Sequence, residues 1–270
     1  MSEFQRVLAP AKLTWSLHVG SRRENGLHEI DAEMLTLDLA DELVIVDGGE
    51  GIVLESESET RASDLTLGSE NLIARALHLA GRQAAVRLKK AIPMGGGLGG
   101  GSADAGAILR WAHFENSRDA LQLGSDVPFC FLGGRARVRG VGEEIEPLAF
   151  VERSVVLFVP PCAIGTAAVY QAFDALQARG GGHHDRNDLS EAALLVEPEL
   201  GAWRACFAEA TGHEPILAGS GSTMFVEGTK ESCGLLGADS LVHNESKGML
   251  FEAKAVPASF GDPGVLSSQR

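Results

Sequence analysis

A glycine-rich segment in the first half of the chain is the clearest candidate for chemistry. Glycine permits left-handed backbone conformations and lets a ligand approach the main chain closely. Because Ser102 opens an Ala-rich segment with helical character, free backbone N–H groups and the positive end of a helix would face the same space, which favours an anion such as phosphate. The predicted phosphate loop consists of Pro93, Met94, Gly95, Gly96, Gly97, Leu98, Gly99, Gly100, Gly101, Ser102 and Ala103.

Other interpretations of this segment fit less well. Flexible linkers seldom lie directly between a strand and a capped helix. A Walker loop requires a lysine after its last glycine, and none is near Gly101. A dinucleotide-binding loop would follow the first strand of a βαβ unit, whereas this loop follows a long β-rich segment. The residues alone therefore predict a nucleotide or phosphate ligand and do not identify it further.

Several segments in the right order resemble motifs of the GHMP small-molecule kinases. They are residues 9–13 with 25–29, 93–105, 124–129 and 218–225. The resemblance extends over nearly the whole chain and implies an α+β fold with two domains. Residues 1–152 would form an N-terminal ribosomal-protein-like β-α domain that binds ATP, and residues 153–270 a ferredoxin-like C-terminal domain. The active site would lie in the cleft between them.

The resemblance also implies a reaction. The γ-phosphoryl group of ATP would pass to the 2-hydroxyl of a diphosphocytidyl-methylerythritol acceptor, in the non-mevalonate synthesis of isoprenoid precursors, with Mg²⁺ bridging phosphate oxygens. The ligands of that metal ion stay open. Two alternatives remain: a GHMP kinase for another acceptor, of the homoserine or mevalonate type, and a catalytically silent nucleotide-binding protein. The retention of both Lys12 and Asp126 argues against a silent protein.

The family motifs give roles to individual residues. Asp126 would accept the proton of the acceptor hydroxyl and Lys12 would offset negative charge; without the motifs, an ordinary turn aspartate and a solvated lysine would be the simpler interpretations. His28 would hydrogen-bond the cytosine and Tyr170 would stack on it. Asp104 could support the phosphate site indirectly or be a first-turn helix acid favoured by the helix dipole, and the second interpretation is expected. The predicted acceptor-binding residues are Thr14, Leu27, His28, Tyr170, Gly221 and Ser222.

Two of these positions depart from the family pattern. Leu27 stands where the family usually has a tyrosine that stacks on cytosine, and Thr14 stands where it commonly has an asparagine. Both differences bear on the identity and affinity of the acceptor. Neither affects the Lys12–Asp126 pair or the phosphate loop.

Periodicity and turn signals predict the elements that position these residues. Strands are expected over 13–19, 34–38, 43–47, 86–92, 127–141, 155–159 and 249–256, with a strand–loop–strand over 215–226. Helices are expected over 71–77, capped by Ser69, and over 102–114, 165–177 and 189–210. Loops are expected over 55–64 and 180–184, and Asn25-Gly26 predicts a hairpin turn.

Composition narrows the class of partner. The formal net charge of −14 argues against binding to nucleic acid or to a membrane surface and leaves a small-molecule substrate. No apolar run has the length of a membrane helix, and the start of the chain lacks the apolar segment of a secretory signal. The four widely spaced cysteines predict neither a zinc site nor a disulfide framework. We therefore expect a cytoplasmic monomer or homodimer.

Overall fold

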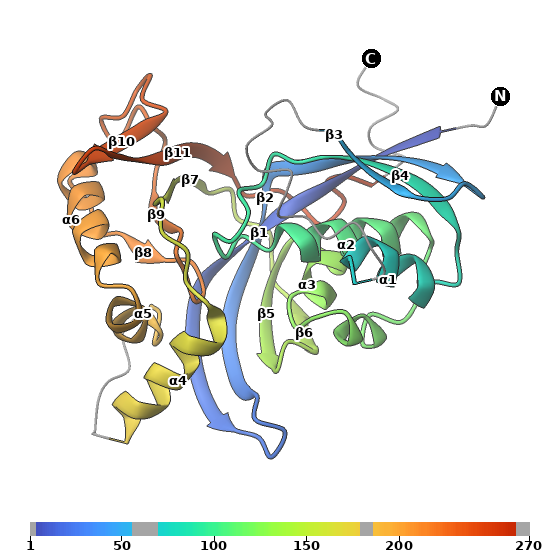
Figure 1. The fold of residues 1–270 in the computed structure, drawn as a ribbon, viewed down its shortest axis with the longest axis horizontal. Helices are drawn as coiled ribbons and strands as arrows, with labels where there is room; N and C mark the ends of the chain where they lie inside the picture. Colours follow the sequence, from blue (N-terminus) through green and yellow to red (C-terminus); the bar gives the residue numbers. More distant parts are fainter. Residues whose placement is uncertain (1–3, 56–69, 179–185, 263–270) are drawn as a thin grey trace.

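The computed structural model describes residues 4–55, 70–178 and 186–262, which form two β-sheets with helices packed against them. Figure 1 shows the two sheets side by side, the first with α1, α2 and α3 and the second with α4, α5 and α6. This is the mixed α+β organisation that the sequence predicts. The sheets are built from residues on either side of 148–153, and the division into domains at 152/153 stays a prediction.

The first sheet is organised around two long antiparallel strands, β1 (Phe4–Arg22) and β2 (His28–Asp47). The predicted turn at Asn25-Gly26 joins them. The remaining strands are β3 (Ile52–Glu55), β4 (Ala84–Lys89), β5 (Arg135–Gly140) and β6 (Glu144–Pro147), in the order β3-β4-β2-β5-β6, with β1 on β2. The helices are α1 (Leu72–Leu79), α2 (Gly100–Trp111) and α3 (Val127–Leu132), with the 3-10 helix η2 (Asp119–Gln122).

The second sheet has the strand order β10-β11-β7-β9-β8. Its strands are β7 (Ser154–Val159), β8 (Ile216–Leu217), β9 (Met224–Glu227), β10 (Ser240–His243) and β11 (Ser246–Lys254). The helices are α4 (Thr166–Gln177), α5 (Ser190–Val196) and α6 (Glu199–Thr211). Phe158 packs on Trp203 and Phe207 with ring centroids 5.5 and 5.2 Å apart, so an aromatic cluster fixes α6 on this sheet.

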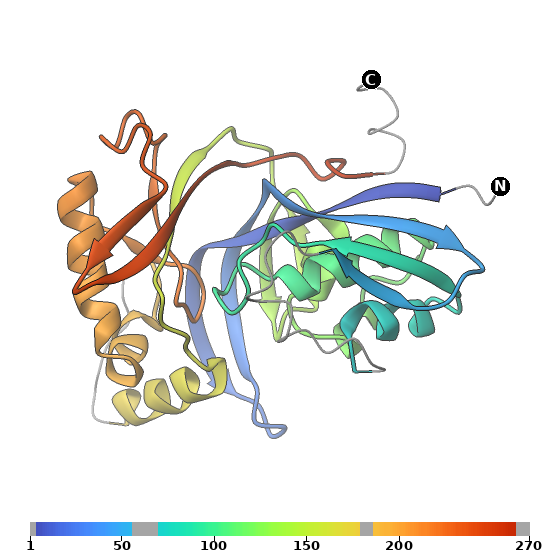
Figure 2. The same cartoon turned by 45° about the horizontal axis from the view of Figure 1, so that its top comes forward.

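Strand β1 connects the two halves. The Leu17 backbone donates to the carbonyl of Arg186 at 2.8 Å and accepts from the N–H of Asp188 at 3.0 Å. The Trp15 ring lies between the guanidinium groups of Arg153 and Arg186, at 4.2 and 4.5 Å. The hairpin end of β1 and β2 consequently lies beside α4 in both views (Figures 1 and 2). Residues of the first half are thus brought into contact with the second.

Several predicted elements differ from the structure. Residues 127–132 are helix α3 rather than strand, because a short buried apolar run has no distinguishing period and Pro128 favours a helical first turn. Residues 34–38 and 43–47 belong to one continuous strand, β2. The helix predicted over 189–210 is divided into α5 and α6 around Pro198, since proline cannot continue a helix without losing a hydrogen bond.

Two further expectations concern caps and helix positions. The side chain of Asn71 caps α1 by accepting from the backbone N–H of Ile73 at 2.8 Å. The cap expected at Ser69, the loop expected over 180–184 and all but the first residue of the loop expected over 55–64 lie outside the described residues; Glu55 is the last residue of β3. The expectation for Asp104 is wrong: it is the fifth residue of α2, beyond the first turn, and its side chain is buried.

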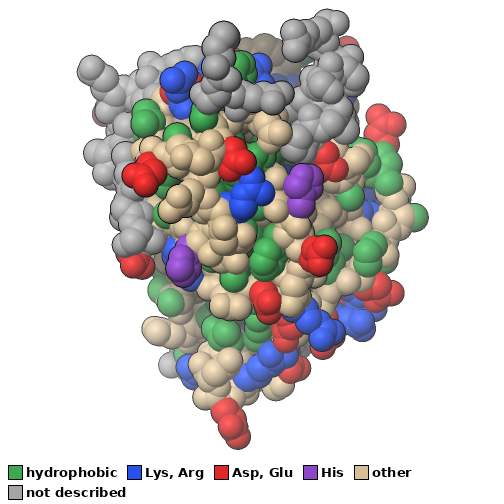
Figure 3. Space-filling model, turned by 90° about the vertical axis from the view of Figure 1, so that its right-hand side faces the viewer, with side chains coloured by type: hydrophobic (Ala, Val, Ile, Leu, Met, Phe, Trp, Pro, Cys, Tyr) green, Lys and Arg blue, Asp and Glu red, His purple; other side chains and the backbone are tan. Residues whose placement is uncertain are grey.

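The distribution of surface charge and the length of the helices are relevant to which partners the protein could bind. At the end of the first sheet, acidic and basic side chains lie beside one another rather than in separate patches (Figure 3). Among the helices of the described ranges, none combines the length and the apolar character that a bilayer crossing requires.

Candidate active site

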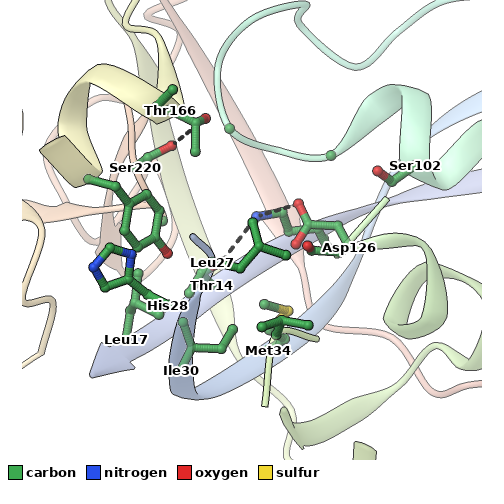
Figure 4. Close-up of a pocket in the computed structure, with 18 of the residues that line it drawn as sticks. Thr14, Leu17, Leu27, His28, Ile30, Met34, Ser102, Asp126, Thr166 and Ser220 are labelled. Carbon is green, nitrogen blue, oxygen red and sulfur yellow. Dashed lines mark hydrogen bonds and ion pairs between the residues drawn. The ribbon is translucent and has the colours of Figure 1, made fainter. Parts of the chain in front are cut away.

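A cavity of about 650 Å³ lies where the β1–β2 hairpin, the glycine-rich loop and α4 meet. Predicted site residues from distant parts of the sequence line it: Lys12, Thr14, Leu27, His28, Gly97, Gly99, Ser102, Asp126 and Tyr170. Figure 4 shows the Asp126 carboxylate and the Thr166–Ser220 pair at this cavity, with His28 at some distance from Asp126. The cavity has one end at the glycine loop, which we call the phosphate end after the ligand expected there, and an opposite end at the hairpin.

An ion pair stands at the phosphate end. The Lys12 ammonium lies 3.3 Å from Asp126 Oδ2 and donates to Thr14 Oγ1 at 3.1 Å. Lys12 projects from β1 and is only 5% exposed, whereas Asp126, at the start of α3, is partly open to the cavity. The Lys12 backbone N–H also donates to the carbonyl of Leu98 at 3.0 Å. Strand β1 thereby holds a buried cation directly beside the glycine loop.

The glycine loop leads into α2 through a left-handed residue. Gly99 precedes the helix with φ +71° and provides no side-chain cap, so the first N–H groups of α2 have no capping side chain. A Cβ on Gly99 would lie 2.7 Å from Lys12 Cγ, and one on Gly97 would lie 2.8 Å from the carbonyl oxygen of Gly221. Larger residues would therefore displace the lysine or the loop at 218–223.

Only part of the predicted loop lines the cavity. Gly97, Gly99 and Ser102 do so. The other predicted loop residues do not line it: Pro93, Met94, Gly95, Gly96, Leu98, Gly100, Gly101 and Ala103. The carbonyl of Gly96 accepts the N–H of Thr223 at 3.2 Å, which joins this loop to the glycine motif of the second half.

Two stacked rings mark the opposite end of the cavity. The His28 and Tyr170 rings are 5.1 Å apart with an angle of 26° between their planes. His28 Nε2 lies 2.7 Å from Asp174 Oδ1, and because a carboxylate can only accept, Nε2 carries the proton. Burial, with a smaller contribution from Asp126, raises the pKa of Tyr170 to about 12, so the ring stays a neutral phenol. Leu27, on the hairpin, is 48% exposed.

The predicted acceptor-binding residues of the C-terminal glycine motif, Gly221 and Ser222, do not line the cavity. The Ser222 hydroxyl is buried and donates to the carbonyl of Cys162 at 2.7 Å. Gly219 and Ser220 line the cavity instead. The Ser220 hydroxyl lies 3.0 Å from that of Thr166, the first residue of α4.

Sequence reasoning missed further lining residues, among them Arg22, Thr166, Gln171 and Asp174. Asp174 could have been found, because it follows Tyr170 by one helical turn and i, i+4 residues share a helix face. Arg22, whose guanidinium lies 3.7 Å from Asp174 Oδ2, had no such signal.

The side chains of the site offer a metal ion few ligands of their own. Within the described ranges, no three His, Cys, Asp or Glu side chains gather closely enough to hold a metal ion.

Known proteins share the fold, and a family model matches the segment that contains the glycine loop. Residues 69–134 match the model of the GHMP kinase N-terminal domain. The mevalonate kinase of L. major, solved with R-mevalonate, has the same fold, with a TM-score of 0.62 at 12% identity over 95% of this chain and 99% of that one. The fold and the glycine-loop site thus define a GHMP-type kinase architecture, and the predicted α+β class is confirmed.

More similar proteins resolve the family within that class. The 4-diphosphocytidyl-2-C-methyl-D-erythritol kinase of Paracoccus denitrificans is 37% identical over 82% of this chain and 86% of its own length. That of Thermus thermophilus is 36% identical over 81% and 86%. A crystal structure of 4-(cytidine 5'-diphospho)-2C-methyl-D-erythritol kinase superposes with a TM-score of 0.70 at 31% identity, over 93% of this chain and 99% of that one. The chain belongs to the 4-diphosphocytidyl-2-C-methyl-D-erythritol kinase family.

Proposed function

We propose that this protein transfers the γ-phosphoryl group of ATP to the 2-hydroxyl of 4-diphosphocytidyl-2-C-methyl-D-erythritol. The observation that carries the proposal is the position of the Lys12–Asp126 ion pair, at 3.3 Å, in a cavity with the glycine loop at one end and the His28–Tyr170 stack at the other. ATP, bound at the glycine loop, and an acceptor whose cytosine lies at the His28–Tyr170 stack could therefore meet at the Asp126 carboxylate.

The phosphate end supplies positioning and charge. Backbone N–H groups at Gly97, Gly99 and the start of α2, with the Ser102 hydroxyl, would bind the β- and γ-phosphates. The Lys12 ammonium would offset the negative charge that develops on the transferring group. Because Lys12 is nearly buried, its charge is little screened by water.

Asp126 would serve as the general base. The acceptor hydroxyl oxygen bonds to the γ-phosphorus, the bond from that phosphorus to the bridging oxygen breaks, and ADP leaves with the electron pair. The hydroxyl proton passes to the Asp126 carboxylate. Lys12 keeps this carboxylate aimed at the cavity through their ion pair.

The donor set at the phosphate end fits Mg²⁺ bound through ATP. Magnesium prefers oxygen ligands and usually takes one or two carboxylates together with substrate phosphates and water. Because Asp126 would serve as the base and the described residues hold no closed metal cage, phosphate oxygens and water would supply most of the ligands. When bound, Mg²⁺ would neutralise phosphate charge.

The hairpin end would bind the cytidyl group. Tyr170 offers an aromatic surface, and His28, held by Asp174 through Nε2, would contribute its stacked ring and its other ring nitrogen to contacts with the cytosine. Thr14, held by Lys12, lies between the two ends. We further infer a cytoplasmic enzyme, monomeric or homodimeric, whose partners are ATP, Mg²⁺ and this small acceptor.

An ADP-release assay with a panel of acceptors tests the function. We expect release with 4-diphosphocytidyl-2-C-methyl-D-erythritol and only background release with homoserine or mevalonate. Preference for either of the latter would replace the proposed acceptor. ATP binding without release on any acceptor would favour the silent alternative.

A further inference from the structure

Three charged side chains, two buried carboxylates and one lysine whose side chain is 14% exposed, lie beneath the glycine loop, outside the cavity. They are Asp41 of β2, Lys90 directly after β4, and Asp104 of α2. The Lys90 ammonium contacts Asp41 Oδ2 and lies 2.9 Å from Asp104 Oδ2. Burying such charges costs desolvation energy that their attraction often fails to repay, so stability alone is a weak reason for this cluster.

The cluster contacts the chain at both ends of the loop. Asp41 Oδ1 accepts the backbone N–H groups of Ala91 and Ile92, at 2.6 and 2.8 Å, immediately before Pro93. Asp104 lies in the second turn of α2, immediately after the loop. A Cβ on Gly100 would lie 3.2 Å from the Lys90 ammonium, so the start of α2 rests directly against it. Lys90 thereby couples the entry of the loop to its exit.

We propose that Asp41, Lys90 and Asp104 are positioning residues that set the affinity for ATP by fixing both ends of the phosphate loop. The inference rests on the proposed function, since it takes the loop as the ATP site. None of the three lines the cavity, so they act through the loop backbone. Backbone N–H groups bind phosphate well only when they are held near their productive geometry.

The charge of the cluster supports this role. Two ionised carboxylates and one ammonium would leave a net negative charge beneath an anion site. Asp104 Oδ1 is buried and has no hydrogen-bond partner in the described part of the chain, which is less costly for a protonated acid than for a carboxylate. Burial raises the pKa of Asp104 to about 8. The Lys90 ammonium lowers this pKa, and the Asp41 carboxylate raises it by a smaller amount than burial does. Cys130, whose pKa burial raises to about 12, adds no charge nearby.

The consequence for binding has a definite sign. Below the pKa of Asp104 the cluster is neutral, and above it a negative charge develops under the phosphates. ATP binding by the wild-type protein should therefore weaken as the pH rises from about 7 to about 9. In Asp104→Asn the amide oxygen still accepts from Lys90 while no carboxylate can ionise. That variant should match the wild type near pH 7 and lose the weakening at higher pH.

Calorimetric titration of the full chain with ATP and Mg²⁺ tests the proposal. Asp104→Ala should weaken ATP binding by about tenfold or more, because the exit of the loop is released. Asp41→Asn conserves the volume of the side chain but turns an amide N–H toward the Lys90 ammonium, so it should weaken ATP binding by a similar factor. This second variant tests the proposal if Asp104→Ala does not fold. The KM for the acceptor should stay within about twofold in both variants.

A matched control separates positioning from general destabilisation. Asp188 is also buried, but it lies in the second half and accepts the backbone N–H of Val19 at 2.8 Å. Asp188→Ala should lower the Tm and leave ATP affinity within about twofold. Folded Asp104→Ala and Asp41→Asn proteins with wild-type ATP affinity, or an equal loss in Asp188→Ala, would overturn the inference. A wild-type protein that binds no ATP would instead overturn the proposed function.

Discussion

The two ends of the cavity are built in different ways. The phosphate end comes mainly from the first half, with the glycine motif of the second half packed against it, and relies on glycine backbone, a nearly buried lysine and a hydrogen bond from β1 to the loop. The hairpin end joins side chains of the first half, Leu27 and His28, to Tyr170 and Asp174 of α4 in the second half. Main-chain groups suit a phosphate chain whatever the acceptor, whereas the side chains at the hairpin end can vary with the acceptor. The difference predicts that changes at one end leave the other substrate's binding intact.

The largest effect is expected at the junction of the two ends. Asp126→Asn removes the proton acceptor while preserving the shape of the side chain, so kcat should fall by about 10²- to 10⁴-fold. Steady-state kinetics would measure kcat, and calorimetry should show ATP affinity changed by no more than a few-fold. As a control, Asp119→Asn alters an exposed aspartate of η2 and should leave kcat unchanged. Near-normal turnover in Asp126→Asn would remove the base assignment.

The next effect belongs to the phosphate end alone. In Gly99→Val the side chain would meet Lys12 at a position where φ is +71°, so ATP affinity should fall by about a hundredfold. Calorimetry with ATP measures this. Gly81→Val is the matched control, because Gly81 also has a positive φ, of +64°, but no atom would lie within 4 Å of its Cβ. An equal loss of ATP affinity in both variants would mean that backbone strain, rather than the loop site, is responsible.

The hairpin end should give the complementary result. Tyr170→Ala removes the aromatic surface beside His28, so the KM for the cytidyl acceptor should rise by roughly ten- to a hundredfold. The KM for ATP should hardly change. Tyr170→Phe keeps the ring and should retain most of the acceptor affinity. If Tyr170→Ala raised both KM values together, the separation of the two ends would not hold.

The smallest effect is expected from adding an aromatic contact at the hairpin end of the cavity. Leu27→Tyr places a ring on the exposed hairpin residue that lines the cavity, and the KM for the acceptor should fall by about two- to tenfold. Kinetics at saturating ATP would measure it. Val53→Tyr introduces the same ring on β3 at another exposed position and should change nothing. A rise in acceptor KM for Leu27→Tyr would show that the bound base does not approach the hairpin.

The sequence predicts best what depends on local pattern. The glycine segment, the Asn25-Gly26 turn and the helix over 166–177 have short-range signals, and the structure contains each of them. The pattern at residues 127–132 predicts a strand where the structure has helix α3, because the apolar run that begins at Val127 is too short for a period to show.

Contacts between distant segments had no such signal. Asp104 was expected as a first-turn acid, because nothing local shows that Lys90 and Asp41 approach it from β4 and β2. The partnership of His28 with Asp174 likewise depends on how the hairpin meets α4. The glycine motif at 218–225 predicts a loop near the site, but which of its residues face the cavity is decided by the packing of Ser222 against Cys162.

Phosphorus NMR of the reaction product tests the central claim most directly. Wild-type protein incubated with ATP, Mg²⁺ and 4-diphosphocytidyl-2-C-methyl-D-erythritol should yield ADP and a new phosphomonoester resonance, with the diphosphate of the acceptor intact and the new phosphate coupled to the carbon at position 2. Asp126→Asn should give this resonance only at a greatly reduced rate. A product without the new monoester, or with the phosphate on another hydroxyl, would contradict the account.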